Sequence, residues 1–242
     1  MQITQSLVKS LEQECPRKVY EDFTNPKPAY PGSPMDKGSY FETMCLGSGA
    51  RGVVTTSLPL LNSGKKSADQ IRIERQAQRF LNMFNPSHVE FCGKTIAEKQ
   101  IKITHGRNEG TIDFITSPTI MYDLKLTENL DGYWDDTSSI DFLQQTYYEW
   151  LFFKDRGFYP ENRLLIFEYG PKERIKEIKI NNSDEAIERM LERISHTTNL
   201  VDEWSVLDEW PREPQLSSCS KCPLSCSKRL IKESIIFEEV NL

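Results

Sequence analysis

The stretch GTIDFITSPTIMYDLKLT, residues Gly110 to Thr127, holds two short apolar segments on either side of Ser117-Pro118. Two such segments joined by a short turn signal predict a β-hairpin in the core of the protein. Yet the first segment carries Asp113, and the second carries Asp123 and Lys125. Because acidic residues are poor strand formers and costly to bury, these charges in a core hairpin indicate a function.

The length of the loop decides whether the two carboxylates meet. A three-residue loop at positions 117–119 makes Asp113 and Asp123 cross-strand neighbours, with roughly 5 Å between their Cβ atoms. A two-residue loop would put them on opposite faces of the hairpin. In either case Asp123 and Lys125 share a face and Leu124 points the other way, since side chains alternate along a strand.

Two carboxylates at that separation repel one another, and a hard cation such as Mg²⁺ or Mn²⁺ relieves the repulsion. A protonated Lys125 cannot ligate the ion, but it can hold an attacking water or the charge that grows on a phosphate. The pattern therefore predicts a metal site for hydrolysing a phosphodiester. The alternative is a solvated hairpin in which Asp123 and Lys125 form a surface ion pair.

The arrangement resembles the PD-(D/E)XK nuclease superfamily, whose signature is an acid on one strand and (D/E)-x-K on the next. Three further matches resemble its RecB-type branch: GTID matches Gly-x-x-Asp, GSYFE holds Glu42 where that branch has a helix-borne metal ligand, and QQTYY matches Gln-x-x-x-Tyr. The metal ligands that the resemblance implies are Glu42, Asp113, Asp123 and the Leu124 carbonyl. The catalytic or bracing residues that it implies are Asp113, Asp123, Lys125, Gln144 and Tyr148.

Four of the six cysteines extend the resemblance to both ends of the chain. CPRKVY at Cys15 and CSKCPLSC at Cys219, Cys222 and Cys226 are similar to the iron–sulfur members of the branch, which include CRISPR-associated exonucleases and the AddB nuclease domain. The resemblance implies a [4Fe–4S] cluster. By spacing alone, four thiolates suit structural Zn²⁺ equally well. Either metal would join the two ends of the chain and contribute folding energy.

Apolar periodicity predicts the remaining elements. The expected helices cover residues 4–20, with a kink or restart at Pro16, then 38–46, a helix that begins at Ser67, 139–154 and 183–194. The expected strands cover residues 98–104, 110–116, 119–125, 163–169 and 175–180.

This order predicts a mixed α/β sheet flanked by helices. We expect a restriction-endonuclease-like PD-(D/E)XK core over residues 38–195. A small cysteine-rich metal-cluster subdomain would be formed by both termini, residues 1–37 and 196–242.

Composition limits the function classes further. Hydrophobic content of 38% and charged content of 27% allow a packed core. The net charge of −6 gives no bulk attraction to nucleic acid, so DNA binding needs a local basic groove. The sequence shows neither a long apolar span nor a signal peptide, so we expect a soluble cytoplasmic protein with no membrane partner.

Other charged residues have two interpretations each. Arg72, Arg75 and Arg79 share one helix stripe and form either a solvated face or a phosphate track. Glu98 and Glu168 could extend the metal site, although solvation on an edge strand is the simpler interpretation. We expect Cys45 and Cys92 to be small core residues.

Together these features predict a Mg²⁺- or Mn²⁺-dependent deoxyribonuclease, an exonuclease that acts on single-stranded DNA or duplex ends. Its setting would be recombination, repair, phage or CRISPR adaptation, with a protein partner from that setting. The alternatives are a structure-specific endonuclease of the same chemistry and a non-catalytic nucleic-acid-binding module that keeps the fold.

Overall fold

The chain divides into two units, one of Met1–Pro28 with Arg189–Leu242 and one of Ala29–Glu188. The computed structural model describes residues 1–26, 30–48, 54–84, 94–117, 119–207 and 209–212. None of the helices in these ranges is long and apolar enough to cross a membrane. Four of the six cysteines lie outside the described residues: Cys92, Cys219, Cys222 and Cys226.

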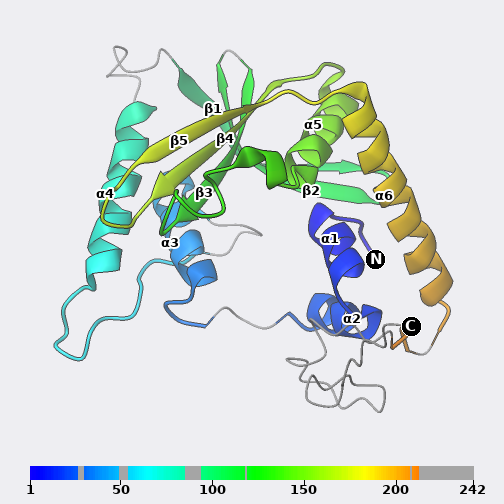
Figure 1. Cartoon of the computed structure of the whole chain (residues 1–242), viewed down its shortest axis with the longest axis horizontal. Coiled ribbons are helices and arrows are strands. Elements are labelled where there is room, and N and C mark those ends of the chain that lie inside the picture. Colours follow the sequence, from blue (N-terminus) through cyan, green and yellow to red (C-terminus); the bar gives the residue numbers. More distant parts are fainter. Residues whose placement is uncertain (27–29, 49–53, 85–93, 118, 208, 213–242) are drawn as a thin grey trace, which may run out of the picture. The chain divides into compact units, whose positions relative to one another are not determined.

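A five-stranded mixed sheet is the centre of the Ala29–Glu188 unit, as predicted (Figure 1). Its strands are β1 (Thr95–His105), β2 (Asn108–Ser117), β3 (Ile120–Thr127), β4 (Glu161–Glu168) and β5 (Ile175–Ile180), which lie side by side in this order. Only the β3–β4 pair is parallel, because a helix separates these two strands in the sequence. Every strand therefore pairs with its neighbour in the chain.

The register of the β2–β3 hairpin is the one that a three-residue loop predicts. Phe114 pairs with Tyr122, and Thr116 pairs with Ile120. The rings of Phe114 and Tyr122 stack with centroids 4.7 Å apart and planes 5° apart. A cross-strand aromatic pair of this kind contributes about 0.5–1.5 kcal/mol beyond its buried area, which helps to fix the register.

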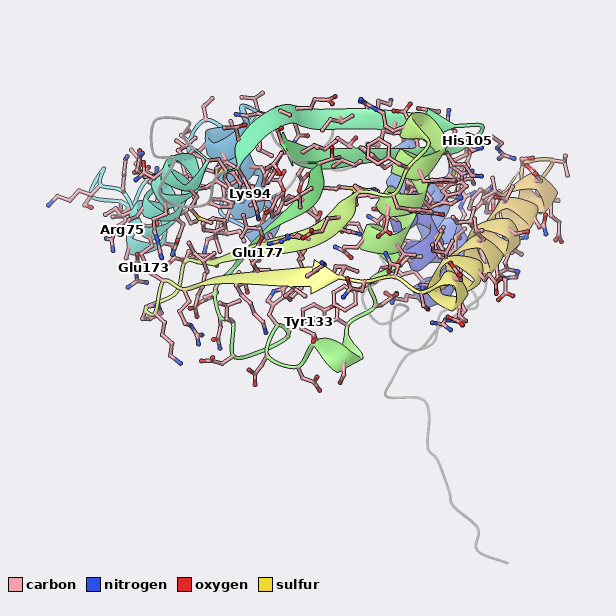
Figure 2. The ribbon with its side chains drawn as sticks, turned by 90° about the horizontal axis from the view of Figure 1, so that it is seen from above. Arg75, Lys94, His105, Tyr133, Glu173 and Glu177 are labelled. Carbon is pink, nitrogen blue, oxygen red and sulfur yellow. The ribbon has the colours of Figure 1, made fainter. Side chains whose placement is uncertain are left out.

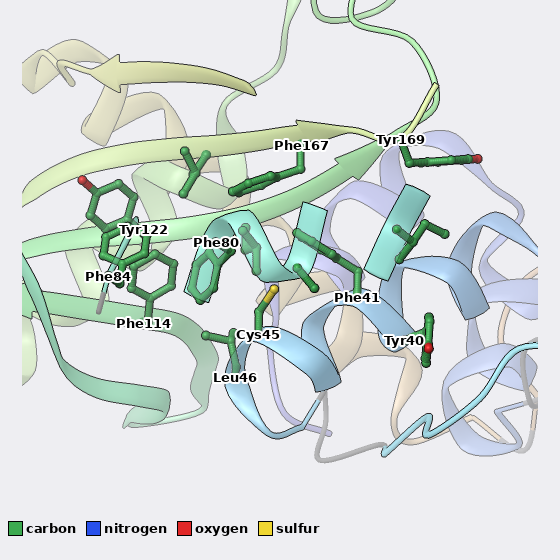
Figure 3. Close-up of a cluster of buried hydrophobic side chains, with 14 of the residues drawn as sticks. Tyr40, Phe41, Cys45, Leu46, Phe80, Phe84, Phe114, Tyr122, Phe167 and Tyr169 are labelled. Atoms are coloured by element: carbon green, nitrogen blue, oxygen red, sulfur yellow. The ribbon is translucent and has the colours of Figure 1, made fainter. Parts of the chain in front are cut away.

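One face of the sheet packs on α3 (Pro34–Leu46) and α4 (Ala68–Met83). Both helices have a serine N-cap, since Ser33 accepts from the Asp36 N–H and Ser67 from the Gln70 N–H. Half of the buried residues in the core between helices and sheet are aromatic (Figure 3). The confirmed core residue Cys45 is 1% exposed there. The start of α3 at residue 34 corrects the prediction of residue 38, because proline at the first helical position does not stop a helix.

The other face carries α5 (Leu143–Arg156) beside a small apolar cluster. Leu124 belongs to the α3 and α4 core, so its strand neighbours Asp123 and Lys125 lie on the α5 face. The apolar cluster on that face contains Leu130, Leu164 and Ile166. The helix α5 begins four residues later than residue 139, because residues Thr137–Ser139 form a separate 3-10 turn.

The unit that contains both ends of the described chain is helical. Pro16 restarts the first predicted helix, which gives α1 (Gln5–Gln13) and α2 (Pro16–Thr24). The helix α6 (Asp184–Trp204) extends ten residues beyond the predicted end, and Arg193 on it pairs with Glu12 on α1. Trp210 is buried and its ring lies 5.1 Å from that of Tyr20.

Candidate active site

Asp113 lies where β2 and β3 separate. The pairing of the two strands ends at Phe114 and Tyr122, whereas β3 continues to pair with β4 as far as Thr127. Beyond that point the Leu124 N–H donates to a side chain instead of to a strand carbonyl, since the Asp113 Oδ2 atom accepts it at 2.7 Å. This hydrogen bond holds the Asp113 carboxylate against the backbone between Asp123 and Lys125.

Asp123 and Lys125 form a direct ion pair on β3. The Lys125 Nζ atom lies 2.9 Å from Oδ1 and 2.8 Å from Oδ2 of Asp123. The Asp123 side chain is only 6% exposed and the Lys125 side chain is 30% exposed. The pair is therefore not the solvated surface pair that was the alternative interpretation of the hairpin.

Gln144 and Tyr148 come from the first turns of α5 and meet this pair. The Gln144 Oε1 atom accepts from the Lys125 Nζ at 3.2 Å, and the Gln144 Nε2 atom donates to the Tyr148 hydroxyl at 3.3 Å. The four-residue spacing puts both on one side of the helix, as predicted. Gln144 thus connects the ammonium of Lys125 with the phenol of Tyr148.

Gly110 allows α5 to approach β2 closely. A Cβ atom at this position would lie 2.7 Å from Cε1 of Tyr148 and 2.9 Å from Cδ1 of Leu151. No side chain other than hydrogen fits such a contact without moving the Tyr148 ring. The glycine of the GTID segment therefore has a packing role, which is to seat Tyr148 beside the strand that carries Asp113.

The electrostatics of the site are those of crowded carboxylates. Burial, the charge of Asp123 and to a smaller extent that of Glu42 on α3 raise the pKa of Asp113 well above its ordinary value, against the opposing effect of Lys125. Desolvation would lower the pKa of Lys125, but Asp123 and Asp113 together raise it. Burial raises the pKa of Tyr148 to about 12, so its hydroxyl stays protonated at neutral pH. The Asp113 carboxyl is therefore within electrostatic reach of both Asp123 and Glu42.

Gln145 is a residue of the site that sequence reasoning missed. It is 5% exposed, and its Nε2 atom donates to the Oδ2 atom of Asp123 at 2.9 Å. The available signal was the doubled glutamine in QQTYY, of which the four-residue spacing to tyrosine selects only Gln144. Both glutamines contact the Asp123–Lys125 pair: Gln144 contacts the ammonium and Gln145 contacts the carboxylate.

The donor set fits a hard divalent cation in part. Among the described residues, no three or more His, Cys, Asp or Glu side chains are grouped so as to hold a metal ion. Mg²⁺, however, is commonly held by one or two carboxylates, and waters and substrate phosphates complete its shell. Asp113 and Asp123 supply such a pair, and burial together with the charge of Asp123 raises the pKa of Asp113. The residues present therefore fit Mg²⁺ or Mn²⁺ in a site that substrate helps to complete.

Glu168 is buried, which corrects its interpretation as a solvated edge-strand residue, and its side-chain hydrogen bonds run to Arg174 and Leu130, not to the candidate site residues. Its strand, β4, lies inside the sheet between β3 and β5. The side chain is 2% exposed and holds the guanidinium of Arg174 through both oxygens, at 2.7 Å and 3.1 Å. The Leu130 N–H also donates to it at 3.3 Å. Glu168 thus attaches the segment after β3 to the β4–β5 turn.

Two of the three arginines of the α4 stripe bind the same turn, and the third, Arg72, lies 3.8 Å from Asp69. Arg75 forms an ion pair with Glu173 at 2.5 Å, and Figure 2 shows the two side chains together at one end of the sheet. Arg79 donates to the Glu173 carbonyl and to Gln76 Oε1. Glu98 pairs with Arg156 at 3.0 Å. These contacts are structural and involve none of the candidate site residues.

Comparison with solved structures shows where this fold occurs. A candidate exonuclease from Eubacterium rectale superposes on 97% of this chain and 91% of its own, with a TM-score of 0.68 and 14% sequence identity. The two chains share a fold. An alkaline exonuclease from Laribacter hongkongensis covers 84% of the chain at 10% identity, with a TM-score of only 0.41. No protein-family model matches the sequence, and neither does any curated protein.

Proposed function

We propose that the protein is a metal-dependent DNA nuclease, and specifically an exonuclease that acts on single-stranded DNA or duplex ends. The observation that carries the proposal is the group formed by Asp113, Asp123 and Lys125 at the opening between β2 and β3. A binding module would need no ammonium beside two buried carboxylates. The fold shared with the candidate exonuclease from Eubacterium rectale supports the same reaction class.

In this proposal Asp113 and Asp123 hold Mg²⁺ or Mn²⁺, with Glu42 and the Leu124 carbonyl as further ligands. The cation would supply a water of lowered pKa and a Lewis acid for the phosphate. Lys125 has a raised pKa, so it stays protonated and can orient the attacking water and stabilise the charge on the phosphate. Gln144 restrains its ammonium, and Tyr148 restrains Gln144 in turn.

The decisive experiment is digestion of end-labelled linear and circular single-stranded DNA with Mn²⁺, with and without EDTA. An exonuclease trims linear DNA and spares circles, whereas a structure-specific endonuclease cuts both. Asp113→Asn and Lys125→Met should each remove cleavage. Lys37→Met is the matched control, since Lys37 forms a comparable pair with Asp69 at 2.7 Å and lies outside the proposed machinery. Undiminished cleavage by both site variants would refute the proposal.

We further propose that Cys15 with Cys219, Cys222 and Cys226 binds a [4Fe–4S] cluster. Cys15 is a free, partly exposed thiol at the N-cap of α2, which suits a metal ligand. The other three cysteines lie outside the described residues. Anaerobic purification should give a brown protein that absorbs in the visible range, whereas structural Zn²⁺ would give a colourless protein that contains zinc. A partner protein in recombination, phage or CRISPR adaptation remains a prediction from the resemblance.

A further inference from the structure

The two glutamines at the start of α5 make opposite contacts with one ion pair. Gln144 offers its oxygen to the Lys125 ammonium, and Gln145 offers its nitrogen to the Asp123 carboxylate. Each amide therefore presents the atom that matches the charge it meets. Gln145 is the more buried of the two, and the Asp123 oxygen is the acceptor of its Nε2 atom.

The backbone of Gln145 is fixed to the sheet. Asn162 on β4 is 2% exposed, and its Nδ2 atom donates to the Gln145 carbonyl at 3.0 Å. The same Nδ2 atom donates to the Glu149 carboxylate at 3.0 Å, one turn further along α5. Asn162 thus holds two successive turns of the helix against the strand that pairs with β3.

A second asparagine extends this network, in which the buried Asn162 Oδ1 atom has no hydrogen-bond partner. Asn182, which follows β5, donates through Nδ2 to the same Glu149 oxygen at 2.6 Å. Its own Oδ1 atom accepts from the Thr146 hydroxyl at 2.8 Å. Hydrogen bonds between side chains that bond one another away from water help to specify one geometry. The first turns of α5, and Gln145 with them, are therefore fixed by four side chains from three segments of the chain.

We infer that Gln145 is a positioning residue that orients Asp123 for metal binding, an inference that rests on the proposed function. Lys125 contacts both oxygens of Asp123 at nearly equal distances, so it does not distinguish one oxygen from the other. The Gln145 amide selects Oδ2 and fixes the plane of the carboxylate. As a neutral donor it does this without adding a charge that would compete with the cation. Residues that orient a metal ligand typically affect metal affinity or activity 10–100-fold.

The test compares Gln145→Met with Gln76→Met. Both variants remove a buried glutamine amide, because Gln76 is fully buried and its Nε2 atom donates to the Glu168 carbonyl at 2.7 Å. The measurements are Mn²⁺ affinity by paramagnetic resonance titration and cleavage of end-labelled linear DNA. Gln145→Met should weaken Mn²⁺ binding about 10–100-fold, whereas Gln76→Met should leave it unchanged. In an Asp123→Asn background, the effect of Gln145→Met on Mn²⁺ affinity should disappear.

A metal-free measurement separates this inference from the proposed function. The loss of thermal midpoint caused by Gln145→Met should be smaller in the Asp123→Asn background, because the contact is already weakened there. A wild-type protein that neither binds Mn²⁺ nor cuts DNA would refute the proposed function, and the metal-free cycle would still decide whether the contact exists. If the wild type binds and cuts while Gln145→Met does so equally well, or loses no more affinity than Gln76→Met, the inference is overturned.

Discussion

Lys125 contacts both carboxylate oxygens of Asp123, at 2.9 Å and 2.8 Å, although only Leu124 separates them on the strand. The same ammonium also lowers the cost of burying Asp113, whose pKa would otherwise be raised still further by burial and by Asp123. One cation therefore serves two carboxylates. Removal of the Lys125 ammonium should leave the two carboxylates without a compensating positive charge until a metal ion replaces it.

Lys125→Met should lower the free energy of unfolding by about 2 kcal/mol in the absence of metal, because it leaves Asp123 buried and unpaired. The figure is below that of a fully buried pair, since the lysine side chain is 30% exposed. Urea unfolding in EDTA measures it. The double variant Lys125→Met with Asp123→Asn should recover most of the loss, and an equal or larger loss would contradict this account of the site.

Gly110→Ala should destabilise the protein by about 1–3 kcal/mol, the usual range for overpacking. The added methyl meets Tyr148 and Leu151, so the ring beside Gln144 must shift and cleavage should also fall. Gly38→Ala is the matched control: it lies within α3 and its Cβ would have no neighbour within 4 Å. That variant should be about 0.5–1 kcal/mol more stable. Unfolding curves that rank the two variants the other way would contradict the packing role of Gly110.

Glu149→Gln should change how stability depends on pH. Burial raises the pKa of Glu149, and the bonds from Asn162 and Asn182 offset this only in part. The folded protein thus holds the proton more tightly, and this contribution to stability is full below the unfolded pKa of about 4.3 and declines as pH rises through the folded pKa. The variant lacks this decline, so its free energy of unfolding should rise relative to that of the wild type between pH 4 and pH 7. Parallel stability curves over that range would show that Glu149 does not titrate as described.

Glu168→Gln should have the opposite dependence. Hydrogen bonds from Arg174 lower the pKa of Glu168, and this effect, together with the backbone donors, outweighs the opposing effect of burial. The contribution of Glu168 to stability is therefore full above its unfolded pKa and is lost as pH falls through its folded pKa. At pH 7 the variant should be about 2 kcal/mol less stable, since it breaks a pair with one buried and one partly exposed partner. The difference from the wild type should shrink below about pH 4. A constant difference across this range would point to packing alone.

The sequence predicts most of the sheet because its strands are local. β1, β2 and β3 follow one another with short turns, and the alternation around Ser117 left two registers of the hairpin open, of which the structure has the one with the three-residue loop. The restart of the helix at Pro16 is equally local, since proline has a fixed effect on the backbone.

What the sequence does not reveal depends on distant segments. Asn162, which is buried, and Asn182, which is half-buried, have no pattern that marks them as partners of α5, and only their approach to Glu149 explains them. Glu168 was misinterpreted because an acidic residue at a strand end suggests an edge, whereas its arginine partner lies beyond the next turn. Gln145 was missed because its acceptor is 22 positions away.

The strand order also bears on how the molecule forms. The meander of β1, β2 and β3 brings Asp113 to the Leu124 amide through contacts that are close in sequence, so this half should form early. The glutamines of α5 arrive only when the crossover to β4 closes a longer loop. The carboxylates would then meet before the side chains that orient them. Pulse-labelled hydrogen exchange should find the Leu124 amide protected ahead of the amides of β4. It would thus detect a state in which the carboxylates have met but the α5 glutamines do not yet contact their partners.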